Sequence, residues 1–193
     1  AHMWVANFND NSVTKIRVSD GYVMGTYAVG NGPVGVAFDG ANIWVTNYYA
    51  ATVSKLRASD GGAVGTYAVG SGPIGVTFDG ANTWVANYYS DNVTKLQASN
   101  GSLVGTYAVG DGPRSIAFDG VHVWTANNDG TVTRLLASDG TLADSYTVEG
   151  GPFGVAFDGV CIWVTNSAAD TVTKLTSDGV VVGTYSVGDY PLW

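Results

Sequence analysis

The chain has 193 residues, of which 46% are hydrophobic and only 12% are charged, with a net charge of −8. Proteins that bind nucleic acid gather lysine and arginine in clusters, so this acidic chain is expected to have no nucleic-acid partner. No apolar run reaches the length of a membrane span, and the single cysteine, Cys161, excludes an intrachain disulfide.

A repeated segment organises the chain. Residues 32–47 recur almost verbatim at 72–87 and 112–127 and, after a spacing one residue shorter, at 151–166. Tryptophan stands at one position of every repeat, with spacings of 40, 40, 40 and 39 residues: Trp4, Trp44, Trp84, Trp124 and Trp163. A fixed period of about 40 residues is typical of propeller blades, each built from four short strands.

Four strand-like pieces with turn residues between them fill each period. In the second repeat they are residues 34–38, 43–47, 52–58 and 64–69. The first piece ends at Asp39-Gly40, a strong signal for a tight hairpin. Short strands joined by short turns at this spacing predict antiparallel hairpins.

Both alternating sets of side chains are apolar or small in the first two strands of a repeat. Val36 and Phe38 fall on one side of the strand, and Gly35 and Ala37 fall on the other. A sheet with one wet face would alternate apolar with charged residues. These strands must therefore be covered on both faces, as radial stacking of blades provides. We predict an all-β protein, a β-propeller with five blades of four antiparallel strands.

Short motifs carry a resemblance to a known repeat family. Trp-Val-Thr-Asn stands at 44–47 and 163–166, and Thr-Val-Ser-Lys-Leu and Thr-Val-Thr-Lys-Leu stand at 52–56 and 171–175. This pattern resembles the 40-residue YVTN-type repeat of bacterial and archaeal propellers. The Gly-Pro-x-Gly-Val-Ala motif at 32–37 is similar to that of NHL-type repeats and streptogramin B lyases. The resemblance implies a propeller used in adhesion, in scaffolding or, in a few cases, in catalysis.

We expect a single domain over residues 1–193. Repeat boundaries are predicted near 1–33, 34–73, 74–113, 114–152 and 153–193. A fragment of a six- or seven-bladed ring is the alternative to five blades.

The two ends of the chain fall inside repeats, because Ala1 aligns with Ala41 and residues 191–193 align with 33–35. The first blade is therefore expected to be closed by a C-terminal inner strand or to lack one. Three readings stay open: the natural chain continues past Trp193, the first blade has three strands, or another molecule supplies the fourth.

Metal-ligand residue types recur at one turn position of the repeat: His2, Asn42, Asn82, His122 and Cys161. Equivalent positions on neighbouring blades lie about 10 Å apart, whereas zinc ligands lie about 2 Å from the ion. We therefore expect no metal site here, and no cofactor. The repeated aspartates Asp39, Asp79, Asp119 and Asp158 each precede glycine, so a turn role explains them.

One base recurs at the same register of every repeat: Lys15, Lys55, Lys95, Arg134 and Lys174. We expect these side chains to be solvated or paired with aspartate, and to contribute little to stability individually.

Two sets of loops converge on one face of the predicted propeller, and there the repeats differ most. Aromatic residues beside Asn and Asp suit stacking on sugars or peptides. The candidate ligand-binding residues of this loop face are Phe8, Tyr48, Tyr49, Tyr88, Tyr89, Asp111, Arg114, Asn128, Phe153 and Tyr190.

The function predicted from these features is a non-enzymatic binding or scaffold module that presents its loop face to a protein or glycan. We expect a bacterial protein that is secreted or lies at the cell surface. A partner chain that supplies the missing strand is one way in which the first blade could be completed. Two alternatives are an enzyme like the streptogramin B lyases, or another hydrolase, and a purely structural repeat from a larger array. The lyase resemblance implies a histidine acid–base with magnesium, but only His2 and His122 are present, so no catalytic residue carries over.

Overall fold

The computed structural model describes residues 1–192, which form strands and turns without a helix. The first sheet contains β1 (His2–Asn7), β2 (Ser12–Arg17) and β3 (Val23–Ala28). The second contains β4 (Pro33–Phe38), β5 (Asn42–Asn47), β6 (Thr52–Arg57) and β7 (Ala63–Ala68). The third contains β8 (Pro73–Phe78), β9 (Asn82–Asn87), β10 (Asn92–Gln97) and β11 (Leu103–Ala108). The fourth contains β12 (Pro113–Phe118), β13 (His122–Asn127), β14 (Thr131–Leu136) and β15 (Leu142–Thr147). The fifth contains β16 (Pro152–Phe157), β17 (Cys161–Asn166), β18 (Thr171–Thr176) and β19 (Val181–Ser186).

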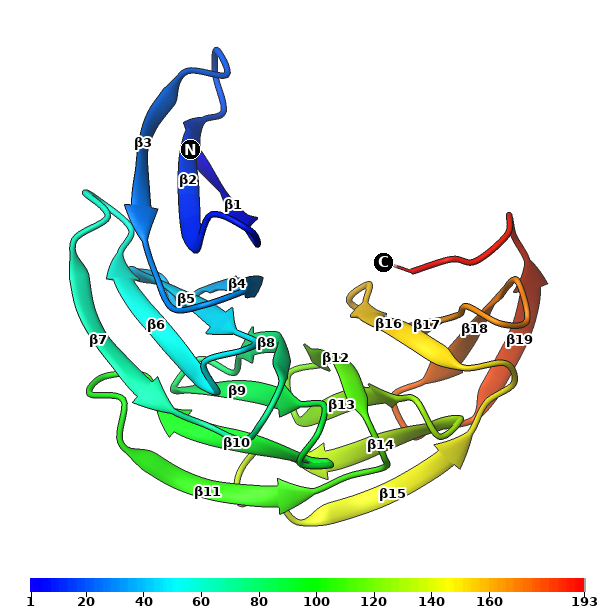
Figure 1. Cartoon of the computed structure of the whole chain (residues 1–193). Helices are drawn as coiled ribbons and strands as arrows, with labels where there is room; N and C mark the ends of the chain where they lie inside the picture. The colour runs from blue at the N-terminus through cyan, green and yellow to red at the C-terminus, as the bar shows by residue number, and fades with distance from the viewer. Residues whose placement is uncertain (193) are drawn as a thin grey trace.

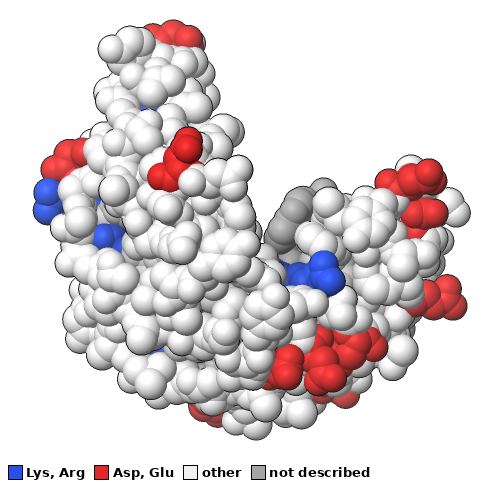
Figure 2. Space-filling view, viewed as in Figure 1, with Lys and Arg blue, Asp and Glu red and all other residues white. Residues whose placement is uncertain are grey.

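Each sheet is an antiparallel meander whose strands follow the order of the chain, and we number the sheets as blades 1 to 5. The first strands of blades 2 to 5, namely β4, β8, β12 and β16, lie next to one another around the axis. The blades form an open arc with a wide gap between blade 1 and blade 5 (Figure 1). Side chains do not fill this gap (Figure 2).

The prediction of an all-β propeller with five blades is confirmed, and the strands of blade 2 begin and end within one residue of the predicted bounds. Blade 1 has three strands, and β1 pairs with β2 alone. Blade 1 was expected either to be closed by a C-terminal inner strand or to lack one, and within residues 1–192 it lacks one.

The repeated aspartate holds the turn between the first two strands of a blade. In blade 2, the Asp39 carboxylate accepts hydrogen bonds from the backbone N–H groups of Ala41 and Asn42 at 2.9 and 2.6 Å. Its second oxygen accepts the indole N–H of Trp44 at 2.8 Å. The same indole bond recurs in blades 3, 4 and 5. The predicted turn role of these aspartates is thus confirmed, and each aspartate also orients a tryptophan.

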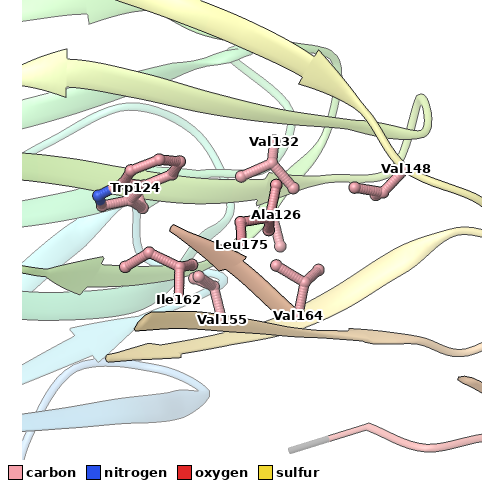
Figure 3. Close-up of a cluster of buried hydrophobic side chains, with 8 residues drawn as sticks. All are labelled: Trp124, Ala126, Val132, Val148, Val155, Ile162, Val164 and Leu175. Carbon is pink, nitrogen blue, oxygen red and sulfur yellow. The ribbon is translucent and has the colours of Figure 1, made fainter. Parts of the chain in front are cut away.

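The hydrophobic core lies between the blades. Trp44, Trp84 and Trp124 are fully buried, and each packs on aliphatic side chains of the next blade. Between blades 4 and 5, Trp124 and Val132 lie against Ile162 and Leu175 (Figure 3). Because each interface repeats with the same residue types, the 40-residue period in the sequence becomes a periodic core.

The expectation that the repeated bases are solvated or paired with aspartate is wrong for most of them. Lys55 and Lys95 are only 3% exposed and lie between blades. The Lys95 ammonium donates to the carbonyls of Ala137 and Ser138 in the next blade, at 2.7 and 3.0 Å. It also lies 4.8 Å from the centroid of the Trp84 ring. A cation held by carbonyl dipoles and an aromatic face is satisfied without a carboxylate.

Candidate functional site

The loop face of the propeller carries a continuous row of ring and guanidinium contacts. It is built by the loops that follow β1, β5, β9 and β13 and by the connections that enter blades 2 to 5. We call this set the aromatic row, and it consists of Phe8, Tyr49, Tyr48, Tyr89, Tyr88, Arg114 and Phe153.

The first half of the row joins blades 1 and 2. The ring centroids of Phe8 and Tyr49 are 5.5 Å apart, and those of Tyr49 and Tyr48 are 5.2 Å apart in an edge-on arrangement. Such tilted and edge-on pairs are favourable for aromatic quadrupoles. Tyr49 is 65% exposed, so its ring is held by neighbours and yet open to a ligand.

A hydrogen bond between two tyrosines joins blade 2 to blade 3. The Tyr48 hydroxyl donates to the Tyr89 hydroxyl at 2.9 Å, and their ring centroids are 5.8 Å apart. Burial of its ring and this hydrogen bond raise the pKa of Tyr48 to about 12. Because Tyr48 is the donor in this bond, the O–H of Tyr89 is available to donate to a ligand.

Arg114, on the first strand of blade 4, connects blade 3 to Phe153 of blade 5, where the row ends. Its guanidinium lies 5.3 Å from the Tyr88 ring centroid and 4.8 Å from that of Phe153. It also donates to the side-chain carbonyl of Asn128 at 2.6 Å. A cation between two rings keeps a fixed position, so the row presents one positive charge among neutral side chains.

Glycine turns beneath the tyrosines make room for the row. The backbone N–H of Tyr48 donates to the carbonyl of Gly32 at 2.8 Å, which lays its loop on the connection into blade 2. A Cβ on Gly32 would stand 2.8 Å from Tyr49, and one on Gly72 would stand 2.7 Å from Tyr89. Both glycines have positive φ. The turn therefore needs glycine for its backbone conformation and for the ring that covers it.

Three of the predicted site residues, Asp111, Asn128 and Tyr190, are not members of the row, and of these only Asn128 contacts it, by accepting a hydrogen bond from Arg114. Asp111 is exposed on the connection into blade 4, where its backbone N–H donates to Asp129 at 2.9 Å. Tyr190 is 62% exposed at the end of the arc, beyond blade 5. The other predicted residues, Phe8, Tyr48, Tyr49, Tyr88, Tyr89, Arg114, Asn128 and Phe153, are brought together.

Sequence reasoning missed the supporting residues Gly32, Gly72 and Gly112. A Cβ on Gly112 would stand 3.0 Å from Tyr88. For Gly32 and Gly72, the available signal was a Tyr-Tyr pair 16 residues further along the chain, at 48–49 and 88–89; Gly112 has no such pair after it.

The histidines stand at the opposite end of the blades from the aromatic row. His122 follows the turn after β12, where its Nδ1 lies 3.3 Å from the Asp119 carboxylate. His2 begins β1 at the same end. Among residues 1–192, no three His, Cys, Asp or Glu side chains gather where they could hold a metal ion.

Two further features of the surface are relevant to partners. The visible face carries scattered acidic side chains and sparse lysine and arginine (Figure 2). No helix of residues 1–192 could cross a bilayer.

Comparison with solved structures finds the same fold at low sequence identity. A functionally unknown protein from Desulfotomaculum acetoxidans superposes with a TM-score of 0.87 and 15% identity, over 98% of this chain and 67% of that protein. A streptogramin B lyase superposes with a TM-score of 0.82 and 20% identity, over 97% of this chain and 65% of the lyase. Virginiamycin B lyase from Staphylococcus aureus superposes with a TM-score of 0.83 and 16% identity, over 96% of this chain and 66% of that lyase.

The chain thus spans about two thirds of the length of these three propellers. No family model matches the chain, and no curated protein does either. In fold, the chain is a β-propeller whose structural neighbours are proteins like the streptogramin B lyases.

Proposed function

We propose that the chain is a non-enzymatic β-propeller module that presents its aromatic row to a glycan or protein ligand. One observation carries this proposal: successive members of the row contact one another across all five blades, with separations between 4.8 and 5.8 Å. A structural role alone would bury these rings, but Tyr49 and Tyr89 remain 65% and 64% exposed.

The chemistry of the row suits a ligand with flat, weakly polar faces. Tyrosine rings stack on the C–H faces of sugars and on peptide groups, and their hydroxyls supply directional hydrogen bonds. Because the rings are fixed by one another and by the glycine turns, little side-chain entropy is lost on binding. Arg114 adds the one cationic group of the row, next to its end at Phe153, which favours an oriented ligand.

A glycan array and a pull-down with the purified domain test the proposal. The Tyr49→Ala/Tyr89→Ala double variant should lose binding by about tenfold or more, the range for aromatic hot-spot residues. Tyr22→Ala is the matched control, because Tyr22 is 60% exposed at the opposite end of blade 1. Binding that survives the double variant, or that Tyr22→Ala reduces equally, would contradict the assignment.

An enzyme is the second candidate, and the fold shared with streptogramin B lyases favours it. His122 would be its base, although Asp119 already contacts the ring and the aromatic row lies at the other end of the blades. Turnover abolished by His122→Ala would support catalysis, whereas an unchanged rate would remove this candidate. The remaining alternative, a purely structural repeat, predicts silence in both the binding and the turnover assays.

A further inference from the structure

The two ends of the arc expose the two halves of an interface that the chain uses four times internally. Every blade from 1 to 4 presents what we call its tryptophan face, which in blade 2 contains Trp44, Lys55 and Tyr67. The next blade receives it with an aliphatic face, which in blade 3 contains Val85, Leu96 and Ala98. The buried lysine also donates to a backbone carbonyl of that face, as Lys55 does to Ala98 at 2.6 Å.

The tryptophan face of blade 5 is uncovered. Trp163 is only half-buried, whereas its three counterparts in blades 2 to 4 are fully buried. Tyr185 is 48% exposed and Val187 is 44% exposed. The Lys174 ammonium lies 4.8 Å from the Trp163 ring centroid. Within residues 1–192 it donates to no carbonyl of a following blade, because no such blade is present. A cavity of about 380 Å³ opens beside Trp163 on this face.

The aliphatic face of blade 1 is uncovered as well. Met3 and Val18 are 59% and 58% exposed, and Val5 is 39% exposed. The residues at the positions of Met3 and Val5 in blade 2 are Ile43 and Val45, which are 3% and 0% exposed. Blade 1 therefore exposes to solvent the aliphatic face that every other blade buries against the preceding blade.

An open space marks the strand that blade 1 lacks. A cavity of about 460 Å³ lies between β1 and β4, lined by His2 and Trp4 on one side and by Val36 and Phe38 on the other. In the other blades this position holds the inner strand. The edge of β1 facing the cavity has no pairing partner among residues 1–192.

The last described residues already follow the path of a strand that enters a following blade. The backbone N–H of Tyr190 donates to Asp170 at 2.8 Å, as that of Gly32 donates to Asn11 at 2.9 Å. These two bonds fix the same turn at the two ends of the arc.

Leu192 then occupies the place of an inner-strand residue. The Thr165 hydroxyl donates to the carbonyl of Leu192 at 3.0 Å, as the Thr46 hydroxyl donates to that of Ile74 at 2.8 Å. Ile74 belongs to β8, the inner strand of the blade that follows. Blade 5 thus presents both a bare face and the first residues of the strand that blade 1 lacks.

We propose that blade 1 of a second copy of this chain docks, head to tail, on the tryptophan face of blade 5. The occupant must offer an aliphatic face, two carbonyls opposite a lysine and an unpaired inner edge. Blade 1 offers all three. Lys174 then meets the carbonyls of Val18 and Ser19 of the second copy, as Lys15 meets those of Ala58 and Ser59 at 2.9 and 2.6 Å.

The register of the docked strand follows from blade 2, where Pro33 is paired with Asn47. Pro191 of one copy therefore lies opposite Asn7 of the other. The two faces differ, so the contact is heterologous, and repeated association gives a ring if the rotation closes and a chain if it does not.

Sedimentation velocity and light scattering of the full chain over a concentration series test this contact. The wild-type mass should rise with concentration. Lys174→Glu and Val18→Asp, on opposite end faces, should each weaken association by about tenfold or more, because each places an unpaired charge in the interface. Val23→Asp, at a 54% exposed position on the outer strand of blade 1, is the matched control and should associate like wild type. Circular dichroism confirms that each variant is folded.

Mixing the two interface variants gives the decisive result. Lys174→Glu retains a native blade 1 and Val18→Asp retains a native blade 5, so the mixture should form a one-to-one dimer that grows no further. A wild-type chain that stays monomeric throughout the series, as expected if the arc closes on itself, overturns the proposal. Association lost in Lys174→Glu but kept in Val18→Asp also overturns it, because that pattern belongs to two blade 5 faces meeting, and so does a mixture that fails to dimerise.

Discussion

The indole N–H of Trp84 donates to the carboxylate of Asp79 at 2.7 Å, across the turn between the two inner strands of blade 3. The ring that this bond orients is fully buried against blade 4. One hydrogen bond thus connects the hairpin inside a blade to the packing between blades. The same pair occurs in blades 2, 4 and 5, so its loss can be compared between covered and uncovered sites.

Replacing Trp84 with phenylalanine removes the indole N–H and part of a fully buried ring. We expect the free energy of unfolding to fall by about 2–3 kcal/mol, from the cavity and the lost charge-assisted bond. Trp163→Phe removes the same atoms from a half-buried ring and should cost about 1 kcal/mol. Urea denaturation of dilute protein measures both values. Equal losses would show that burial against the next blade does not determine how much the tryptophan contributes to the free energy of unfolding.

The aspartate turns should make stability sensitive to acid. Hydrogen bonds from Trp163 and from the backbone N–H groups of Cys161 and Val160 lower the pKa of Asp158 to about 2. At Asp79, burial alone would raise the pKa, but the bonds from Trp84 and the turn backbone outweigh it and the pKa is lowered.

A carboxylate with a lowered pKa stabilises the fold above its unfolded value of about 4, and this contribution disappears as the pH falls toward 2. Urea denaturation between these pH values should show stability decreasing with acid. Asp158→Asn should make the slope of unfolding free energy against pH shallower than in wild type. An unchanged slope in Asp158→Asn would contradict the assignment.

Removing a buried lysine should expose the role of the carbonyls that it binds. In Lys95→Met the carbonyls of Ala137 and Ser138 lose their donor inside the interface, and we expect a loss of about 1–3 kcal/mol. Lys174→Met in dilute protein is the control, because no following blade within residues 1–192 presents carbonyls to Lys174, and its loss should stay within about 0.5 kcal/mol. Chemical denaturation of both variants measures the two losses. A larger loss in Lys174→Met than in Lys95→Met would contradict this prediction.

Tyr48 of the aromatic row should titrate late. Because the folded pKa of Tyr48 is raised to about 12, its contribution to stability is complete below the ordinary tyrosine value of about 10 and is lost as the pH rises from 10 to 12. Ultraviolet absorbance of tyrosinate should show a late component that Tyr48→Phe removes. Tyr22→Phe should leave this component in place, and its loss in that control would reassign the late titration.

The fold was predictable because its signals are local and repeated. Three features recur in register in every full repeat: the Asp-Gly turn, the strand bounds, and apolar residues on both faces of the inner strands. Together they are typical of a β-propeller. The burial of Lys95 was not predictable from its own neighbourhood. It depends on carbonyls 42 and 43 residues further along the chain, whose position follows from the packing of two blades.

The residues of the aromatic row could be chosen from the sequence as candidates, but the contacts between them could not. Divergence between repeats indicated the tyrosines of the loop face, yet nothing in the sequence shows that Tyr48 reaches Tyr89, 41 residues away. That contact arises from the packing of blade 2 against blade 3. Asp111 and Tyr190 share the loop face by register, but their backbone N–H groups bond to Asp129 and Asp170 and neither side chain belongs to the row.

An arc in which blades contact their neighbours, with open ends, behaves as a one-dimensional array rather than as a closed ring. In such arrays each unit is stabilised by its own strands and by nearest-neighbour interfaces, so cooperativity weakens toward the ends. Blade 3 has a neighbour on each side, whereas blade 1 has three strands and one neighbour. Amide hydrogen exchange should therefore be slowest in β9 and fastest at the terminal blades, which makes unfolding a fraying from the ends inward.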